Sequence, residues 1–387
     1  MPDSQPQRRR NPLDELTALG QSLWLDFIRR SLIQSGELRR LVAEEQIRGV
    51  TSNPSIFEKA IGDGEEYDAQ IAEVAPEVGG HPRRIYEALA IADIQAAADV
   101  LEPVYRESDG TDGFVSLEVG PDLAHETEAT VEEARRLWRT VARPNLMVKV
   151  PGTSEGLPAI RRLLAEGINV NITLLFSRHV YAEVAEAYLA ALEQRFDAGE
   201  PIDRVASVAS FFVSRIDTFV DREIDAIVAQ ASTADEIARL RSLRGKVAIA
   251  NAKLAYVHFR DLGATARWQR LARAGAHPQR LLWASTSTKD AAYRDTLYVE
   301  ELIGPETVNT VPPETLEAFR DHGVARPTLA KDVEAADAVL TALAAHVDLD
   351  EVTDQVLAEG ITKFVTPFEK LLETVASRTR EIASREP

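Results

Sequence analysis

Short apolar runs alternate with longer amphipathic stretches along most of the chain. The runs have the length and β-branched content of buried strands. The stretches between them, such as "ETEATVEEARRLWRTVA", repeat apolar residues at helical spacing. The pattern therefore predicts strands that alternate with helices. The eight predicted strands are residues 22–28, 47–53, 113–119, 146–150, 168–176, 205–212, 280–285 and 306–311.

This alternation predicts the α/β class and favours a (β/α)8 TIM barrel over an open sheet. Residues 54 to about 104 have a helical pattern and add helices between the second and third strands. The C-terminal part is helical too, and we expect residues 361–372, "ITKFVTPFEKLL", to fold over the barrel mouth. No segment has the composition of an interdomain linker. We therefore expect a flexible N-terminal arm at 1–11 and a single barrel domain with a helical C-terminal extension at 12–387.

Charge and composition exclude several classes of protein. The 387 residues carry a net charge of −18, which argues against a nucleic-acid partner. No apolar run approaches the ~20 residues that span a bilayer, and no apolar stretch follows the N-terminal arginines as in a signal peptide. We therefore expect a cytoplasmic protein with no membrane partner. The sequence does not decide between a monomer and a homodimer.

No metal or cofactor site is expected. The chain has no cysteine, which excludes disulfides and thiolate ligands, and its seven histidines do not pair at helical or strand spacing. The segment "GDGEEY" (62–67) begins like a dinucleotide fingerprint, but it lacks the third glycine and follows no predicted strand.

Polar residues interrupt strands that should be apolar on both faces in a parallel barrel. In "INVNITLLF", Asn169, Asn171 and Thr173 alternate with aliphatic residues and so share one face of the strand. If helices cover the outside, this face points into the barrel. Barrel enzymes assemble their active sites at the C-terminal strand ends. Other polar residues at or near the predicted strand ends are Asp26, Asn53, Glu118, Lys149 and Ser210.

Lys149 is the most informative of these residues because it lies inside the apolar run "LMVKV". Lysine is almost never fully buried unless it is paired. Burial disfavours the charged form of an amine, so a buried lysine offers a neutral nucleophile near pH 7. A neutral lysine attacks a ketone to form a Schiff base, whose iminium withdraws electrons from the adjacent C–C bond.

Such chemistry also needs groups that move protons and groups that hold a sugar. Asp26 and Glu118 are the carboxylates that can move protons. Asn53, Asn171 and Thr173 can hold hydroxyl groups in place.

The segments around these residues resemble the transaldolase family, the Schiff-base aldolases of the non-oxidative pentose phosphate pathway. The resemblance covers residues 20 to about 325, and "TSNPSIF" and "GINVNITLLFS" are its most specific segments. "VSLEV", "LMVKVPGT", "SVASFFVSRID" and "LLWASTSTK" also contribute. The resemblance implies transfer of a dihydroxyacetone unit between sugar phosphates, from sedoheptulose 7-phosphate or fructose 6-phosphate to glyceraldehyde 3-phosphate or erythrose 4-phosphate.

The resemblance also implies roles for individual residues. Lys149 would be the Schiff-base lysine, and Asp26 would accept the proton of the C4 hydroxyl during C–C cleavage. Glu118 would hold the catalytic water, with Thr173 helping to place it.

The implied substrate-binding residues lie on several strands. Asn53 and Asn171 would bind hydroxyls of the dihydroxyacetone unit, and Ser210 would contact its terminal hydroxyl. Arg215 in "FFVSRID" would hold the substrate phosphate. The alternative for Arg215 is a surface ion pair with an acid of its own helix.

The chain departs from the family at the seventh predicted strand. Many relatives place an arginine two residues after the serine of this motif, as a second phosphate ligand. Here "WASTSTKD" has Ser287 at that position. We assign the phosphate role to Lys289, with Ser285 beside it; lysine acts as a point charge and not as a bidentate fork.

Three other functions are weighed against this one. A glycosidase could use Asp26 and Glu118 as its acid pair, but it would leave Lys149 unexplained. A non-catalytic sugar-phosphate-binding barrel has no need of a buried lysine beside two carboxylates. A related Schiff-base aldolase with a different donor stays open.

Overall fold

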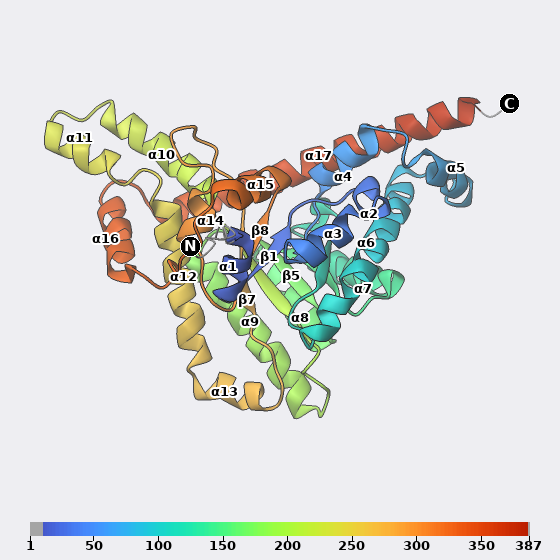
Figure 1. Ribbon diagram of the computed structural model, residues 1–387, viewed down its shortest axis with the longest axis horizontal. Helices are drawn as coiled ribbons and strands as arrows, with labels where there is room; N and C mark the ends of the chain where they lie inside the picture. Colours follow the sequence, from blue (N-terminus) through green and yellow to red (C-terminus); the bar gives the residue numbers. More distant parts are fainter. Residues whose placement is uncertain (1–10, 386–387) are drawn as a thin grey trace, which may run out of the picture.

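The computed structural model describes residues 11–385, which form a closed barrel of eight parallel strands in chain order (Figure 1). This confirms the predicted (β/α)8 barrel. The strands are β1 Gln21–Leu25, β2 Ile47–Val50, β3 Phe114–Glu118, β4 Leu146–Pro151, β5 Val170–Leu175, β6 Ser207–Phe212, β7 Arg280–Ala284 and β8 Thr307–Val311.

Helices precede, connect and follow the strands. The predicted arm at 1–11 lies outside the described residues except for Asn11, whose side chain caps the first helix by accepting from the Leu13 amide at 3.1 Å. Before β4 the helices are α1 Pro12–Ala18, α2 Arg30–Gln34, α3 Glu37–Glu44, α4 Pro54–Gly62, α5 Asp68–Glu77, α6 Pro82–Glu107, the short 3₁₀ helix η1 Pro121–Leu123 and α7 Thr127–Val141. After β4 they are α8 Gly156–Ala165, α9 Arg178–Asp197, α10 Ser214–Val228, α11 Ala234–Arg241, α12 Val247–Gly263, α13 Ala266–Arg273, α14 Leu297–Glu301, α15 Pro313–His322, α16 Val333–Ala344 and α17 Leu349–Arg385.

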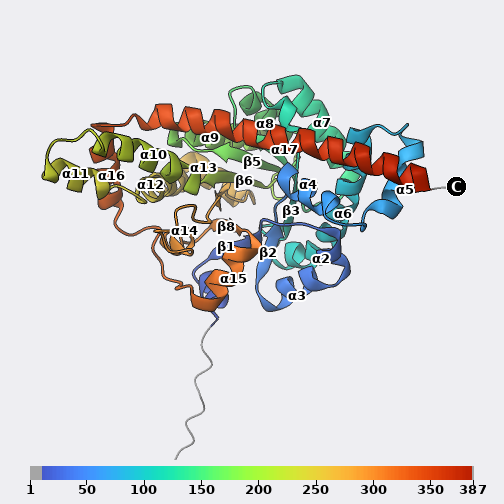
Figure 2. The same ribbon diagram turned by 90° about the horizontal axis from the view of Figure 1, so that it is seen from above.

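The two predicted helical additions are both present. Three helices, α4 to α6, connect β2 to β3. The last helix, α17, has 37 residues and is therefore about 55 Å long. Figure 2 shows it running from the side of α10 and α16 to the side of α4 and α5. Its distal half is held by ion pairs from Arg378 to Asp68 (2.9 Å) and from Lys370 to Glu58 (2.7 Å).

Strand register brings the predicted polar residues to one level of the barrel. Glu118 on β3 lies opposite Lys149 on β4, and Lys149 lies opposite Asn171 on β5. Because all eight strands run in the same direction, their C-terminal ends open at the same mouth.

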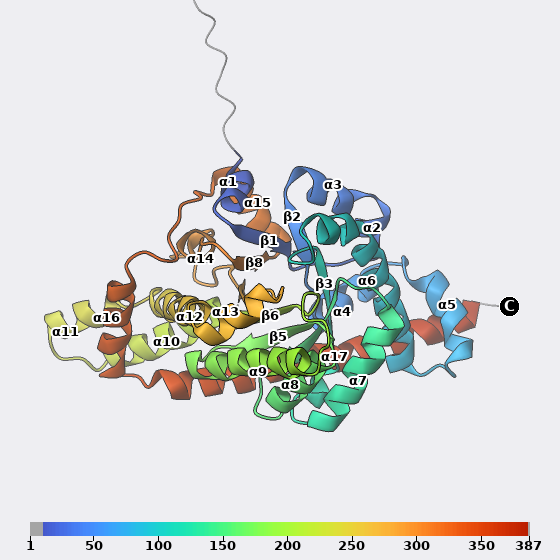
Figure 3. The same cartoon turned by 90° about the horizontal axis from the view of Figure 1, so that it is seen from below.

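A buried tryptophan on β1, Trp24, reaches a carboxylate at the opposite end of the barrel. The ring of Trp24 lies so close to Gly49 on the neighbouring strand that a Cβ there would sit 2.5 Å from it. The indole Nε1 donates to Asp112 Oδ1 at 2.8 Å, and Arg280 pairs with the same carboxylate at 3.4 Å. Asp112 lies just before β3 and Arg280 begins β7, so both stand at the N-terminal ends of the strands; Figure 3 shows β1 and β3 from another side. Asp112 therefore links three strands that are not all neighbours in the sheet.

We expect Asp112→Ala to destabilise the barrel without changing its chemistry. The substitution leaves the buried Trp24 donor without its acceptor, while Arg280 keeps its bonds to the Ser22 hydroxyl and the Thr111 carbonyl oxygen. The change should cost about 2 kcal/mol of the free energy of unfolding. Urea unfolding should show the loss, and KM should stay unchanged. An unaltered urea midpoint would contradict this role for Asp112.

Candidate active site

The barrel mouth contains a cavity of ≈ 250 Å³ at the C-terminal strand ends. Eight of the ten predicted site residues line it: Asp26, Asn53, Lys149, Thr173, Ser210, Arg215, Ser285 and Lys289. The other two, Glu118 and Asn171, lie behind this lining. The site residues predicted from the sequence therefore lie close together in the structure.

Lys149 is buried at the centre of this group, with 5% of its surface exposed. Its Nζ donates to the carbonyl oxygen of Ser52 at 3.3 Å and lies 3.7 Å from Glu118 Oε2. The Phe364 ring lies over the amine at 5.6 Å. Phe364 belongs to the segment expected to cover the mouth, and its place in the cavity lining confirms that expectation.

Glu118 has a buried carboxylate that lacks hydrogen-bond partners within the described residues. Neither of its oxygens has a hydrogen-bond partner among residues 11–385, and the same is true of the Thr173 hydroxyl. Burial raises the pKa of Glu118 to about 7, and the nearby Lys149 ammonium opposes this shift. The Glu118 and Thr173 oxygens can therefore receive an outside hydrogen-bonding group.

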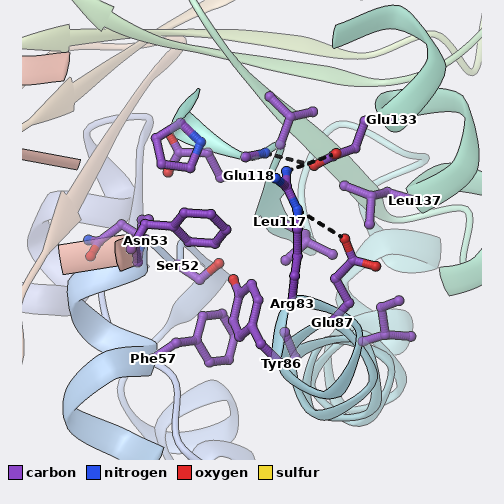
Figure 4. A pocket seen from close by; sticks show the side chains of 17 residues that line it. Ser52, Asn53, Phe57, Arg83, Tyr86, Glu87, Leu117, Glu118, Glu133 and Leu137 are labelled. Carbon is purple, nitrogen blue, oxygen red and sulfur yellow. Dashed lines mark hydrogen bonds and ion pairs between the residues drawn. The ribbon is translucent and has the colours of Figure 1, made fainter. Parts of the chain in front are cut away.

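A second, smaller cavity of ≈ 20 Å³ borders Glu118, and Asn53 lines both this cavity and the mouth (Figure 4). This is room for about one water molecule. Arg83 lies along one wall and pairs with Glu133 at 3.1 Å, while the Gly120 amide donates to the same glutamate at 2.7 Å. These bonds fix the chain two residues after Glu118, so they hold the end of β3 in place. Sequence reasoning did not identify this cluster, because its members lie on different elements.

Asp26 follows β1 and faces the mouth cavity. Its Oδ1 accepts from the Thr51 hydroxyl at 2.6 Å, and Thr51 also contacts the Thr310 hydroxyl at 2.8 Å. Burial raises the pKa of Asp26 above its ordinary value of 3.8, while the Lys149 charge and the Thr51 bond oppose the shift. Sequence reasoning missed Thr51 and Thr310; their position at strand ends was the available signal.

Asn171 and Ser210 form one hydrogen-bonded chain. The Ser210 hydroxyl donates to Asn171 Oδ1 at 2.6 Å, and Asn171 Nδ2 donates to the Ser116 hydroxyl at 3.0 Å. Ser210 lines the mouth cavity, with Asn171 behind it. Asn53 uses its Oδ1 to cap α4 through the Ile56 amide at 3.1 Å, which leaves its amide nitrogen for the cavity.

Arg215 lies between two aromatic rings, with its guanidinium 5.0 Å from the Phe212 ring and 5.8 Å from the Phe364 ring. Its Nη1 is buried and has no acceptor among the described residues. Partial burial lowers the pKa of Arg215 below its ordinary value, against the attraction of Asp26 and Glu118.

The acids on the same helix are engaged elsewhere. Asp217 accepts from the Ala248 amide at 2.8 Å and from the Tyr298 hydroxyl at 2.9 Å. Asp221 accepts from the Gly245 amide at 3.2 Å. A surface ion pair between Arg215 and its own helix is therefore wrong.

The loop after β7 supplies the other cation of the predicted site. Lys289 is exposed at the cavity rim and donates to the Ser287 hydroxyl at 2.7 Å. Ser285 has a left-handed backbone with φ of 55°, and its hydroxyl contacts that of Ser214 at 2.9 Å. The cations at the mouth thus differ: Arg215 lies against two aromatic rings, and Lys289 is exposed at the rim.

Comparison with known proteins agrees with this geometry. The model of the Transaldolase/Fructose-6-phosphate aldolase family matches residues 23–375. The chain belongs to this family. It is 49% identical over 384 residues to "Transaldolase 2" of Nostoc punctiforme, covering 96% of this chain and 99% of the relative. It is also 49% identical to "Transaldolase" of Parafrankia sp. (96% and 99% covered) and 48% identical to that of Thermobifida fusca (95% and 98% covered).

The family membership inferred from the motifs is confirmed, and the chain is an enzyme of the transaldolase/fructose-6-phosphate aldolase family. Within residues 11–385, no group of three or more histidine, aspartate or glutamate side chains is arranged to hold a metal ion. No helix in this part of the chain has the length and apolar character needed to cross a membrane.

We expect Glu118→Gln to stabilise the fold at alkaline pH. Glutamate ionises near pH 4.5 in the unfolded chain and near pH 7 in the folded one, so the wild type loses stability as pH rises between these values. Glutamine removes this loss and should add roughly 1–3 kcal/mol to the free energy of unfolding at pH 8. The gain should shrink as the pH falls towards 5. Urea titrations at several pH values measure it.

A matched control is Glu128→Gln, because Glu128 forms an exposed pair with Arg162. This change should alter stability little at any pH. If Glu118→Gln were less stable than the wild type at pH 8, burial would not be the dominant influence on Glu118.

Proposed function

We propose that the protein is a transaldolase that works through a Schiff base on Lys149. It would transfer a dihydroxyacetone unit from sedoheptulose 7-phosphate or fructose 6-phosphate to glyceraldehyde 3-phosphate or erythrose 4-phosphate, in the pentose phosphate pathway. One observation carries the proposal: a lysine with 5% exposure stands at the barrel mouth beside two carboxyl groups with raised pKa values. Buried lysines of this kind are suited to attack on a carbonyl carbon.

Imine formation begins when the Lys149 amine attacks the ketone carbon of the donor. Loss of water then gives the imine, and this step needs a group that gives and takes protons near neutral pH. Glu118 suits this task, because its pKa of about 7 lets it exchange protons at that pH and it lies 3.7 Å from the amine. The unpaired oxygens of Glu118 and Thr173 support a water site between them.

Carbon–carbon cleavage follows from the iminium. In our proposal Asp26 takes the proton of the C4 hydroxyl, the C3–C4 bond breaks, and its electron pair moves into the iminium to give an enamine on Lys149. The aldehyde fragment leaves. The enamine then attacks the acceptor aldehyde, and hydrolysis of the new imine releases the product ketose. Asp26 lies in the mouth cavity with Lys149, and the Thr51 hydroxyl holds its carboxylate in position.

Substrate binding would use the polar wall of the mouth. The free amide nitrogen of Asn53 and the hydroxyl of Ser210, which is oriented by Asn171, would bind hydroxyls of the dihydroxyacetone unit. Arg215 would take the phosphate, because its buried Nη1 lacks an acceptor among the described residues. Lys289 and Ser285 would complete the phosphate site.

The second candidate is a Schiff-base aldolase that releases free dihydroxyacetone. The description of the matching family, which includes fructose-6-phosphate aldolase, favours this alternative over the other classes. Incubation with fructose 6-phosphate, with and without erythrose 4-phosphate, separates the two activities. A transaldolase needs the acceptor for sustained turnover, whereas an aldolase does not.

Borohydride reduction should identify Lys149 as the nucleophile. In the presence of fructose 6-phosphate, reduction should add a dihydroxyacetone unit to the peptide that contains Lys149, as read by mass spectrometry. Lys253, which is buried with 6% exposure on α12, is the natural internal control and should stay unlabelled. Lys149→Ala should reduce turnover by about 10³-fold or more. Labelling at Lys253 or Lys289 would refute the assignment.

The two cations should contribute unequally to phosphate binding. Arg215→Ala removes a charge-assisted hydrogen bond and should raise KM for fructose 6-phosphate by the equivalent of roughly 2–3 kcal/mol. Lys289→Ala should raise KM less, because Lys289 is an exposed point charge. Neither change should weaken the use of unphosphorylated dihydroxyacetone as a donor. Steady-state kinetics with both donors measure this, and an unchanged KM in Lys289→Ala would exclude Lys289 from the phosphate site.

A further inference from the structure

The C-terminal helix α17 places one aromatic ring in the active-site mouth. Phe364 has 5% of its surface exposed and lines the cavity. Its ring lies 5.6 Å from Lys149 Nζ and 5.8 Å from the Arg215 guanidinium. Both distances fall within the range of cation–π contact. The same ring therefore spans the proposed reacting amine and the proposed phosphate ligand.

One turn before Phe364, α17 contains a glycine, a residue that lowers the stability of a helix. Gly360 lies inside α17, where glycine is among the poorest helix formers. A Cβ at this position would lie 3.4 Å from Arg215 Nη1 and 3.1 Å from Leu174 Cδ2. The small residue thus leaves room for the guanidinium. Residues four apart share a helix face, so Gly360 and Phe364 face the mouth together.

We propose that this face of α17 determines whether the bound dihydroxyacetone unit is transferred to an aldehyde or released. Phe364 is a specificity-determining residue that reserves the bound dihydroxyacetone unit for an aldehyde acceptor, and Gly360 is a positioning residue that allows Arg215 its place. This inference rests on the proposed transaldolase function.

Two fates compete for the enamine on Lys149. In transfer, its nucleophilic carbon forms a C–C bond with the acceptor aldehyde, whose oxygen takes a proton, and water hydrolyses the resulting imine to the product ketose. In loss, the same carbon takes a proton, and water hydrolyses the dihydroxyacetone imine to free dihydroxyacetone and the lysine amine. The two fates differ only in whether an aldehyde or a proton reaches the carbon first.

Phe364 lies where it can suppress proton delivery from solvent. Its ring lies against Lys149 and Arg215 in the lining of the mouth cavity. Once the sugar unit fills this cavity, the apolar ring would keep water from the enamine carbon on Lys149. Glu118 does not line the mouth cavity and borders the second, ≈ 20 Å³ cavity shown in Figure 4. Imine hydrolysis can therefore use water near Glu118 while the enamine carbon stays shielded. The ring also favours the iminium, which carries positive charge.

The first test measures how donor turnover is divided. Wild type, Phe364→Ala and Phe364→Leu are given fructose 6-phosphate and saturating erythrose 4-phosphate, and free dihydroxyacetone is counted against sedoheptulose 7-phosphate. Phe364→Ala should raise the share of donor released as free dihydroxyacetone about fivefold or more. Phe364→Leu keeps an apolar side chain over the mouth, so its released share should stay close to that of the wild type. Leu371→Ala is the matched control, because Leu371 is fully buried on the same helix and does not line the mouth.

The second test concerns Gly360. Alanine is the better helix former, so Gly360→Ala should keep or raise the melting temperature. Gly360→Leu crowds Arg215 and should raise KM for fructose 6-phosphate about tenfold, while kcat with unphosphorylated dihydroxyacetone changes less than twofold. Gly360→Ala should show a smaller rise in KM. A purely structural glycine would instead change melting temperature and both donors together.

The possible results distinguish a failure of the proposed transaldolase function from a failure of the roles given to Phe364 and Gly360. A wild type that produces no sedoheptulose 7-phosphate overturns the proposed function and this inference with it. A wild type that transfers normally, with Phe364→Ala releasing no more dihydroxyacetone than Leu371→Ala, overturns the role of Phe364 alone. An unchanged KM in folded Gly360→Leu overturns the role of Gly360.

Discussion

The crowding of four ionisable side chains at the barrel mouth, with Lys149 and Glu118 buried and Asp26 and Arg215 half-buried, is the constraint on which the rest of the structure depends. Burial raises the pKa values of Asp26 and Glu118 and lowers that of Arg215, so each charged form is disfavoured where it stands. Nearby partners offset the cost of burying these charges only in part: Lys149 and Glu118 are 3.7 Å apart, and Arg215 Nη1 has no acceptor within residues 11–385. Buried charges with loose partners destabilise a fold. Other parts of the molecule must therefore supply the stability that holds this cluster.

The supporting contacts lie around the cluster on every side. Below it, Trp24 and Asp112 connect the lower ends of the strands. Behind β3, Arg83 and Glu133 hold the chain that follows Glu118. On the side of Arg215, Asp217 binds the first turn of α12 and the Tyr298 hydroxyl; its burial raises its pKa to about 7. This network anchors α10, the helix at whose start Arg215 lies.

Backbone strain is also found at the mouth. Leu174 at the end of β5 and Ser285 just after β7 have left-handed backbones, with φ of 61° and 55°. Side chains other than glycine adopt this region at a cost, and such residues gather at functional sites. At Leu174 the pairing of β5 with β6 also shifts register, immediately after Thr173. The strain re-aims the strand end at the point where the proposed water site begins. In a protein with a net charge of −18, local cations and nearby hydrogen-bond donors would have to attract the proposed phosphate substrate.

The sequence by itself determined the barrel, its eight strands and most of the site. Period-two polarity showed that Asn171 and Thr173 share a face, and a lysine in an apolar strand marked the centre of the candidate site, because such patterns depend only on neighbours in the chain. Tertiary structure alone decided which groups meet across elements: the Arg83 cluster behind Glu118, the engagement of Asp217 away from Arg215, and the Phe364 ring over two cations. These contacts join residues tens to hundreds of positions apart, and no local period records them. They exist because barrel closure and α17 bring distant side chains into one volume too small for water to separate them.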